Sequence, residues 1–283
     1  MAGLDRTAAD AGDTRLNAKG RMARSEETVL LTGASAGIGR ELARLAAGDG
    51  HDLVLVARRQ DRLEELAAEL GAAHGVRVTV IAADLSDRAT PGQIAERIHT
   101  AGTRVDYLIN NAGFGTCGPF QEVVLEREME MIEVNVRALV QLTRLFLPEM
   151  LARKRGRILN IASVAGFVPG PFMATYYASK AFVLSFTEAL ARELRGSGVT
   201  VTASCPGPTA TEFGAVARNK DTHLFRRGVA DAASVAGHAY RAMLAGKVVA
   251  IPGLMNKLIA QSIRISPRSV VRALVAYLNR DRK

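Results

Sequence analysis

The segment Thr28-Val-Leu-Leu-Thr-Gly-Ala-Ser-Ala-Gly-Ile-Gly39 carries the strongest structural signal in the chain. An apolar run leads into a glycine-rich turn, and residues 38–47 then have apolar side chains at helical spacing. Gly33 permits a tight turn, Gly37 lets the backbone approach a pyrophosphate, and Gly39 lets the helix pack closely on the strand. The free N–H groups at the start of the helix suit the anion. The segment therefore predicts a strand, a phosphate-binding turn and a helix.

Apolar runs and helical segments alternate along the rest of the chain. We expect strands at 28–32, 53–57, 76–82, 105–110, 157–162, 199–204 and 248–251, and helices at 38–47, 60–73, 87–101, 126–154, 175–195 and 231–245. The strands are apolar almost throughout, which is typical of parallel strands covered on both faces. With right-handed crossovers, this order predicts an α/β fold with a doubly wound (Rossmann) parallel sheet of about seven strands.

Composition divides the chain into three parts. Residues 1–26 form a polar tail without the apolar region of a secretory signal, and we expect them to be disordered. Residues 27–253 form the Rossmann-type domain, and residues 254–283 form a helical extension. No run of 18 or more apolar residues is present, so we expect no membrane span and a cytoplasmic location.

The bulk composition restricts the class of protein. The chain of 283 residues is 48% hydrophobic and 23% charged, which is typical of a soluble globular protein. Cys117 and Cys205 are too few for a disulfide framework, and we expect reduced thiols near the core. The five histidines are scattered without ligand spacing, so no metal site is predicted.

Most of the net charge of +9 lies at the C-terminal end. Residues 254–283 hold seven basic side chains and one acidic side chain, a net charge of +6, and the balanced remainder argues against nucleic-acid binding. The apolar side chains at helical spacing in this extension are Val271, Leu274, Val275 and Leu278. Arg268 and Arg272 stand beside them, and a basic amphipathic helix can lie on an anionic membrane. The alternative is a helix packed on its own domain or on a partner subunit.

Tyr176 and Lys180 are four residues apart, with Ser163 thirteen residues before Tyr176. Positions i and i+4 share a helix face, so the phenol and the ammonium can lie side by side. A nearby cation lowers a tyrosine pKa, and lowering it from about 10 to about 7 takes about 4 kcal/mol. This pair predicts an acid–base catalyst, although an aromatic and a lysine can also share a helix face without any role.

The end of the second expected strand bears on cofactor choice. A carboxylate there would bind the ribose 2′-hydroxyl of NAD(H), but the chain reads Ala57-Arg58-Arg59. Arg58 can pair with a 2′-phosphate through two hydrogen bonds, which favours NADP(H) over NAD(H). The alternative is that both arginines are a solvated start to the next helix. The turn lacks the Gly-Lys-Ser/Thr of a P-loop, which argues against nucleotide hydrolysis.

Together these features resemble the short-chain dehydrogenase/reductase family, in its shorter branch, over about residues 27–252. The motifs that carry the resemblance are Thr32-Gly-Ala-Ser-Ala-Gly-Ile-Gly39, Asp84, Asn110-Asn-Ala-Gly113, Asn135, Ser163, Tyr176, Lys180 and Pro206-Gly207, in this order. The resemblance implies an oxidoreductase that transfers a hydride between a nicotinamide and a carbonyl or secondary alcohol. It implies four catalytic residues: Asn135, which holds a water for Lys180, Ser163, which bonds the substrate oxygen, Tyr176, the proton donor, and Lys180, which lowers the tyrosine pKa and bonds the cofactor ribose.

The resemblance also implies the cofactor contacts. The expected cofactor-binding residues are Gly33, Ser35, Gly37, Ile38, Gly39, Arg58, Asp84, Leu85, Asn111, Ala112, Gly113, Tyr176, Lys180, Pro206, Gly207, Thr209 and Thr211. Among them, Asp84 accepts from the adenine amino group and Thr211 contacts the nicotinamide carboxamide. One departure is Ala36, where some NADP-using relatives have a basic residue, so the cofactor preference depends on Arg58.

The substrate is expected to be an apolar small molecule. Apolar side chains follow the strand ends at Phe114, Phe120, Phe167, Val168, Phe172, Met173 and Phe213, although they can equally be ordinary packing. Residues 207–227 are the expected lid. A homodimer or homotetramer through the two long central helices is expected by analogy. The alternatives are a fatty 3-oxoacyl reductase at a membrane surface and a non-catalytic NADP(H)-binding sensor or scaffold.

Overall fold

A parallel sheet of seven strands forms the centre of the molecule in the computed structural model. The structure describes residues 25–217, 219, 222–223, 229–263 and 265–280, so residues 1–24 of the tail expected at residues 1–26 lie outside the described residues. The strands are β1 (Thr28–Thr32), β2 (Asp52–Ala57), β3 (Val78–Ala82), β4 (Tyr107–Asn110), β5 (Gly156–Ile161), β6 (Val199–Ser204) and β7 (Val249–Ala250). Their order is β3-β2-β1-β4-β5-β6-β7, which confirms the predicted doubly wound sheet.

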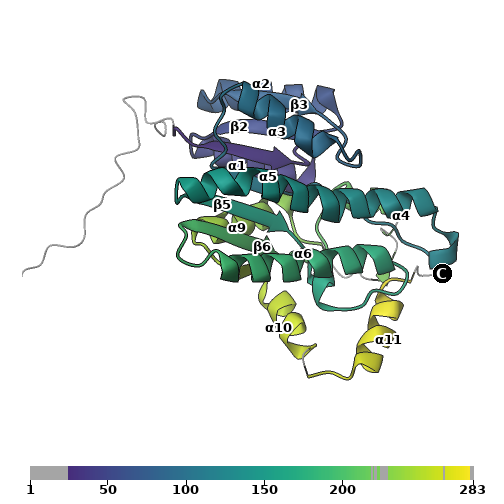
Figure 1. Cartoon of the computed structure of the whole chain (residues 1–283). Coiled ribbons are helices and arrows are strands. Elements are labelled where there is room, and N and C mark those ends of the chain that lie inside the picture. The colour runs from purple at the N-terminus through teal and green to yellow at the C-terminus, as the bar shows by residue number, and fades with distance from the viewer. Residues whose placement is uncertain (1–24, 218, 220–221, 224–228, 264, 281–283) are drawn as a thin grey trace, which may run out of the picture.

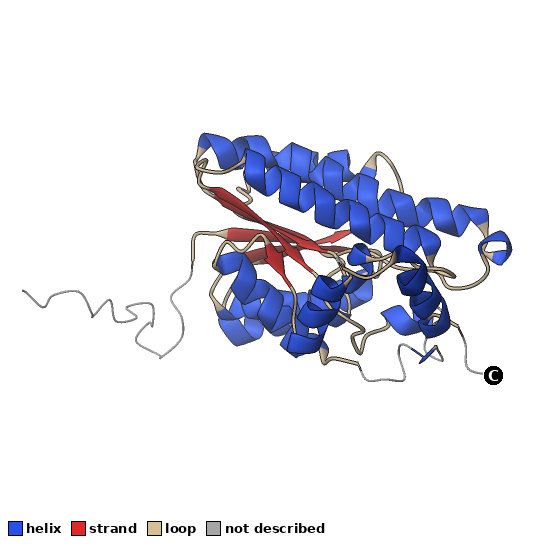
Figure 2. Ribbon diagram, turned by 90° about the horizontal axis from the view of Figure 1, so that it is seen from below, coloured by secondary structure: helices blue, strands red, loops and turns tan. Residues whose placement is uncertain are grey.

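Helices cover both faces of the sheet, as Figure 2 shows. One face packs on α1 (Gly37–Gly48), α2 (Gln60–His74) and α9 (Ala232–Leu244), and the other packs on α3 (Thr90–Thr100), α5 (Leu139–Ala152) and α6 (Ala174–Glu193). Side chains alternate along each strand, so Val29 and Leu31 of β1 face the first layer, whereas Leu30 faces the second. Both layers are apolar, which is why the strands read as continuous hydrophobic runs.

The strand order reverses between β1 and β4, which pair directly with each other. In an open parallel sheet, the loops that leave the carboxyl ends of two such strands diverge and leave a crevice. The glycine turn follows β1 at this point, and Asn111 follows β4. The fold therefore brings together two motifs that are almost 80 residues apart in the sequence.

The helix expected over residues 126–154 contains an irregular turn. It consists of α4 (Leu125–Ile132), a π-helical segment η2 (Glu133–Ala138) and α5. Asn135 lies in η2 and is buried. Short π-helical segments are frequent at functional sites, because the wider turn redirects one side chain. Sequence periodicity did not reveal this segment.

Beyond β7 the chain forms two further helices, α10 (Leu254–Ser262) and α11 (Arg268–Leu278). Figure 1 shows them extending below the body, joined by a linker at the lower edge of the view. Val271 and Val275 of α11 pack in a cluster with Met173 and Tyr177. The inner face of α11 is thus packed on its own chain, and the division of the chain at residue 253 stays a prediction. Among the described residues, no helix is both long and apolar enough to cross a bilayer.

Candidate active site

The glycine turn after β1 is fixed by neighbouring strands. Gly33 N donates to Val56 O of β2 at 2.8 Å, and Asn111 Nδ2 donates to Thr32 O at 3.0 Å and to Gly33 O at 3.1 Å. Gly33 has a φ of +69°, a conformation that other residues rarely adopt. A Cβ on Gly39 would stand 2.5 Å from Asn111 Nδ2 and closer still to Gly33 O. These contacts leave room for a ligand's phosphates against bare backbone only because the positions are glycine.

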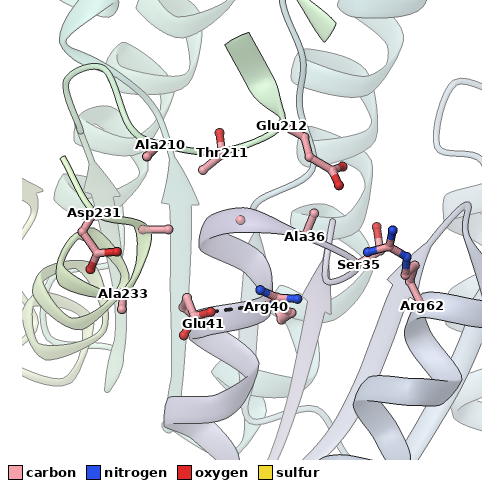
Figure 3. A pocket seen from close by; sticks show the side chains of 12 residues that line it. Ser35, Ala36, Arg40, Glu41, Arg62, Ala210, Thr211, Glu212, Asp231 and Ala233 are labelled. Atoms are coloured by element: carbon pink, nitrogen blue, oxygen red, sulfur yellow. Dashed lines mark ion pairs between the residues drawn. The ribbon is translucent and has the colours of Figure 1, made fainter. Parts of the chain in front are cut away.

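A cavity of about 350 Å³ adjoins this turn (Figure 3). Its lining combines the turn, the helix that follows it and the segment after β6: Ser35, Ala36, Gly37, Arg40, Glu41, Arg62, Ala210, Thr211, Glu212, Asp231, Ala232 and Ala233. Figure 3 shows Thr211 and Glu212 facing Ser35 and Ala36 across the opening. The turn and the predicted nicotinamide segment therefore border the same cavity.

The two arginines after β2 point to different partners. Arg58 Nη1 donates to Glu130 Oε1 at 3.3 Å and lies 3.9 Å from Asp84 Oδ2, with its side chain 58% exposed. Arg59 Nη2 donates to Ser35 Oγ at 3.2 Å and pairs with Glu212 Oε2 at 2.8 Å. Neither arginine is simply solvated. The sequence did not indicate that Glu130 and Glu212 are the partners of these arginines, because both glutamates are far from the arginines along the chain.

Asp84 and Leu85 lie at the end of β3. Ser86 donates to Asp84 Oδ1 from its backbone N at 2.9 Å and from its hydroxyl at 2.8 Å. Burial alone would raise the pKa of Asp84, but the hydrogen bonds from Ser86 and the charge of Arg58 outweigh it and lower the pKa. Asp84 is thus an ionised acceptor at the rim, whereas the Leu85 side chain is buried in the core.

Tyr176, Lys180 and Ser163 come together at the carboxyl ends of β5 and β6. Lys180 Nζ lies 5.9 Å from the centre of the Tyr176 ring and donates to Ile161 O at 2.8 Å. A hydrogen bond joins Ser163 to Tyr176. Ser163 Oγ also lies 3.3 Å from Pro206 O and accepts from Ala165 N at 3.1 Å, where it caps η3 (Val164–Phe167). Ser163 therefore caps η3 and contacts Tyr176 at the same time.

Asn135 links the π-helical segment to the strand end after β4. Its Nδ2 donates to Phe114 O at 2.9 Å and to Ser179 Oγ at 3.1 Å, and its Oδ1 accepts from Phe114 N at 3.1 Å. Only 1% of Asn135 is exposed, so it is no surface asparagine. Space beside Gly113 is shared by the Asn135 amide and the Lys180 amine, which places the two side chains near each other.

Burial changes the acid–base behaviour of the tyrosine and the lysine. It raises the pKa of Tyr176 well above its usual value, although the hydrogen bond from Ser163 acts in the opposite direction. Burial also lowers the pKa of Lys180 to about 8. In the protein alone the tyrosine pKa is therefore raised, and the lowering expected from Lys180 together with a second positive charge stays a prediction. Tyr176 is a protonated phenol at neutral pH.

The buried amine of Lys180 predicts a specific pH dependence of stability. Its pKa is 10.5 when unperturbed and about 8 in the fold, so between these values the unfolded chain binds one more proton and stability rises with pH. Relative to Lys180→Met, the wild-type free energy of unfolding should increase by about 2 kcal/mol between about pH 7 and about pH 9.5. Urea unfolding of both proteins at the two pH values measures it. A constant difference would contradict the burial of the charge.

The segment after β6 borders the same crevice. Thr209 Oγ1 donates to Gly207 O at 2.9 Å, and Thr211 Oγ1 accepts from Phe213 N at 3.2 Å at the start of α7 (Phe213–Val216). A Cβ on Gly37 would stand 2.8 Å from Thr211 Cγ2. Part of the expected lid, residues 218, 220–221 and 224–227, lies outside the described residues.

An apolar cluster surrounds Tyr176, but it differs from the expected set. Its members are Ala165, Met173, Tyr177, Ala217, Val271 and Val275, with Cys117, Val168, Tyr176 and Phe213 packed against them. Phe213 lies 5.1 Å from the Tyr176 ring, whereas Phe167 packs in another cluster and Phe120 is exposed. Ordinary packing thus accounts for part of the predicted set. Within the described residues, neither Cys117 nor Cys205 forms a disulfide.

Helix α11 contributes residues to this site that sequence reasoning missed. Asn279, just after α11, is buried; its Oδ1 accepts from Tyr177 Oη at 3.1 Å, and its Nδ2 donates to Pro171 O at 3.0 Å. Asn279 O also accepts from Cys117 Sγ at 3.8 Å. Helical spacing indicated α11 but not which of its faces turns inward. Among all the residues that the structure describes, no group of three or more His, Cys, Asp or Glu side chains is placed to hold a metal ion.

Comparisons with known proteins agree with this geometry. A family model described as short chain dehydrogenase matches residues 27–222. Sulfoacetaldehyde reductase 2 of Chromohalobacter salexigens is 41% identical over 189 residues, which cover 66% of this chain and 74% of that protein.

Two solved structures have the same fold. A short-chain dehydrogenase from Sphingobium yanoikuyae in complex with NADPH has a TM-score of 0.75 and 35% identity, and the match covers 86% of this chain and 96% of that one. One from Burkholderia phymatum in complex with NAD has a TM-score of 0.74 and 29% identity, with coverage of 84% and 92%. The model match over most of the chain is decisive: the chain belongs to the short-chain dehydrogenase/reductase family and is an oxidoreductase acting on alcohol or carbonyl groups.

Proposed function

We propose that this protein is an NADP(H)-dependent reductase of apolar carbonyl compounds. The observation that carries the proposal is the protonated Tyr176, hydrogen-bonded to Ser163 and lying among apolar side chains at the strand-end crevice. A proton donor must be protonated before it acts, and a raised tyrosine pKa favours that state. The proposal therefore takes the protonated phenol as the starting form of Tyr176 for carbonyl reduction.

The crevice fits a dinucleotide. We assign the phosphates to the turn at Gly33, Gly37 and Gly39, whose tight packing on Asn111, Thr211 and the turn backbone excludes a Cβ. We assign the adenosine end to Asp84 and Asn111. The remaining predicted contacts, at Ser35, Ile38, Leu85, Ala112, Gly113, Pro206, Gly207, Thr209 and Thr211, line or support the same edge of the sheet. When bound, the reduced nicotinamide supplies the hydride.

Four side chains carry the remaining chemistry in the proposed reaction. Tyr176 gives its phenolic proton to the substrate oxygen, and Ser163 hydrogen-bonds the same oxygen as negative charge develops. Lys180 replaces that proton and holds the ribose, and Asn135 orients the backbone at Phe114 and supports the amine. The apolar cluster around Tyr176 excludes water and accommodates an apolar substrate.

The preference for NADP(H) rests on Arg58. Its guanidinium is more than half exposed beside the crevice, and a 2′-phosphate would replace its hydrogen bond to Glu130. Wild type should prefer NADPH, and Arg58→Asp should shift the preference toward NADH by about tenfold or more, since a charged hydrogen bond contributes about 1.5–3 kcal/mol. Cofactor dissociation constants and kcat/KM with each cofactor measure this. Arg192→Asp on α6 is the matched exposed control, and a wild type that favours NADH would refute the assignment.

A second candidate function is reduction of fatty 3-oxoacyl thioesters at a membrane surface. It is favoured by the exposed apolar and basic residues of α10 and α11, which also support our proposal of membrane contact through residues 254–283. A panel of apolar ketones and 3-oxoacyl thioesters with NADPH, followed at about 340 nm, distinguishes the two candidates. Absence of turnover with every carbonyl, together with tight NADPH binding, would instead favour the sensor or scaffold.

We also propose a cytoplasmic homodimer or homotetramer that pairs through α5 and α6. On α6, Phe182 is exposed and stacks on Phe186 with ring centres 5.9 Å apart. An exposed aromatic pair on a long helix suits an isologous contact with a second copy. Sedimentation equilibrium gives the number of subunits.

A further inference from the structure

The described residues of α10, 263, 265–267 and α11, here called the C-terminal hairpin, carry exposed apolar side chains, and these define its outer face. The exposed apolar side chains are Leu254, Met255, Leu258, Ile259, Ile265, Val270, Leu274 and Tyr277. Ile265, in the linker, is 88% exposed. Isolated exposed apolar side chains are normal on a protein surface, but a contiguous group on one element marks an interaction site.

The outer face of α11 is distinct from the face that packs on the site. Val271, Val275 and Asn279 follow each other at four-residue spacing and are all buried. Val270, Leu274 and Tyr277 lie on another face at the same kind of spacing and are exposed. Tyr277 stacks on His223 with ring centres 4.5 Å apart, whereas the inner contacts do not use Val270 or Leu274. The outer face therefore remains available for a partner.

The charge of the hairpin indicates what the partner is. Residues 254–280 contain no aspartate or glutamate. Lys257, Arg268 and Arg272 are exposed, and within the described part of the chain none of them forms an ion pair. Arg280 is also exposed, and its guanidinium lies 5.3 Å from the centre of the Phe172 ring. Exposed apolar side chains among basic side chains without ion pairs suit a partner whose surface is anionic and whose interior is apolar.

We propose that the outer face of the C-terminal hairpin docks on an anionic lipid surface. The apolar side chains of α10, the linker and α11 enter the headgroup region, and the basic side chains pair with lipid phosphates. The hairpin is two-sided: α11 contacts Tyr177 on its inner face and lipid on its outer face. An apolar substrate dissolved in the bilayer would thus be held beside the crevice. The docking rests on the hairpin surface and not on the proposed reaction.

Vesicle sedimentation of the full-length protein tests the docking without any turnover measurement. The protein should sediment with vesicles of phosphatidylcholine and phosphatidylglycerol, less with phosphatidylcholine alone, and less again as ionic strength rises. The double variant Leu258→Asp/Ile265→Asp should lower the partition coefficient at least about tenfold, because each aspartate removes an apolar anchor and is repelled by the lipid. Both positions are exposed, so the variant should keep its circular dichroism spectrum and thermal midpoint.

Leu125→Asp is the matched control. Leu125 is 64% exposed, compared with 55% for Leu258, but it lies in α4 next to Glu122 and Glu126. This variant should partition like the wild type. A wild type that does not sediment with anionic vesicles, or a double variant that partitions equally, overturns the proposal. So does a double variant that changes only the oligomeric mass in sedimentation equilibrium, since the hairpin would then contact a second copy. A wild type that sediments with anionic vesicles but reduces no carbonyl compound would refute the proposed reaction and leave the docking proposal standing.

Discussion

Tyr176→Phe should abolish most turnover while leaving NADPH affinity unchanged. The substitution removes one oxygen, which is the proposed proton donor and the partner of Ser163, and keeps the ring that packs 5.1 Å from Phe213. General acid catalysis contributes about 10²–10⁴-fold, so kcat should fall by at least that range. Steady-state kinetics with NADPH and an active carbonyl substrate give kcat, and fluorescence titration gives the dissociation constant of NADPH.

The neighbouring tyrosine supplies a matched control. Tyr177→Phe removes the same atom one residue along α6, but that hydroxyl donates to Asn279 at 3.1 Å. This variant should lose about 1 kcal/mol of stability from the missing hydrogen bond and retain most of its kcat. Equal losses of kcat in both variants, or turnover that survives in Tyr176→Phe, would show that the phenol of Tyr176 is not the proton donor.

Gly39→Ala should reduce both cofactor affinity and stability. The added methyl group would overlap Gly33 O and stand 2.5 Å from Asn111 Nδ2, so the turn must move away from the strand end after β4. Overpacking of this kind costs about 1–3 kcal/mol, and displacement of the turn should lower NADPH affinity at least about tenfold. Urea unfolding and fluorescence titration with NADPH measure the two effects separately.

Gly48→Ala, at the other end of α1, is the control for Gly39→Ala. A Cβ there meets only His74 Cε1, at 4.0 Å, which is an ordinary contact distance. Since alanine is favoured over glycine in a helix, this variant should be neutral or stabilised by up to about 1 kcal/mol and should bind NADPH normally. If both variants bound NADPH like the wild type, the close approach at Gly39 would have no part in the cofactor site.

Local sequence features were sufficient to predict the sheet and most helices. Apolar runs such as Thr28–Thr32 and Val199–Ser204 became strands with the expected bounds, because strands buried on both faces tolerate few polar residues. The predicted ends of the strands were less accurate where the apolar run is longer than the segment that pairs with a neighbouring strand. The third strand begins at Val78 rather than at residue 76, and the seventh is reduced to Val249–Ala250.

The parts of the site that sequence did not predict depend on contacts across the fold. The π-helical turn at Asn135 needs the backbone of Phe114 as its partner, and Arg58 meets Glu130 only after the sheet forms. The raised pKa of Tyr176 in the protein alone was not predicted, for a related reason. Proximity to a cation was visible in the spacing of Tyr176 and Lys180, but burial, which raises the tyrosine pKa, depends on side chains that other elements bring in.

Substitutions on the inner face of α11 would change the surroundings of Tyr176, and under the proposed function they would change the range of substrates. Val271, Val275 and Asn279 touch the surroundings of Tyr176, yet the helix that bears them supplies no strand and no part of the glycine turn. Changes at these positions can therefore alter which molecules are accepted without disturbing the chemical machinery. Under the proposed function, part of the specificity would then lie in a different stretch of the polypeptide from the catalytic residues, and either could be exchanged while the other is preserved.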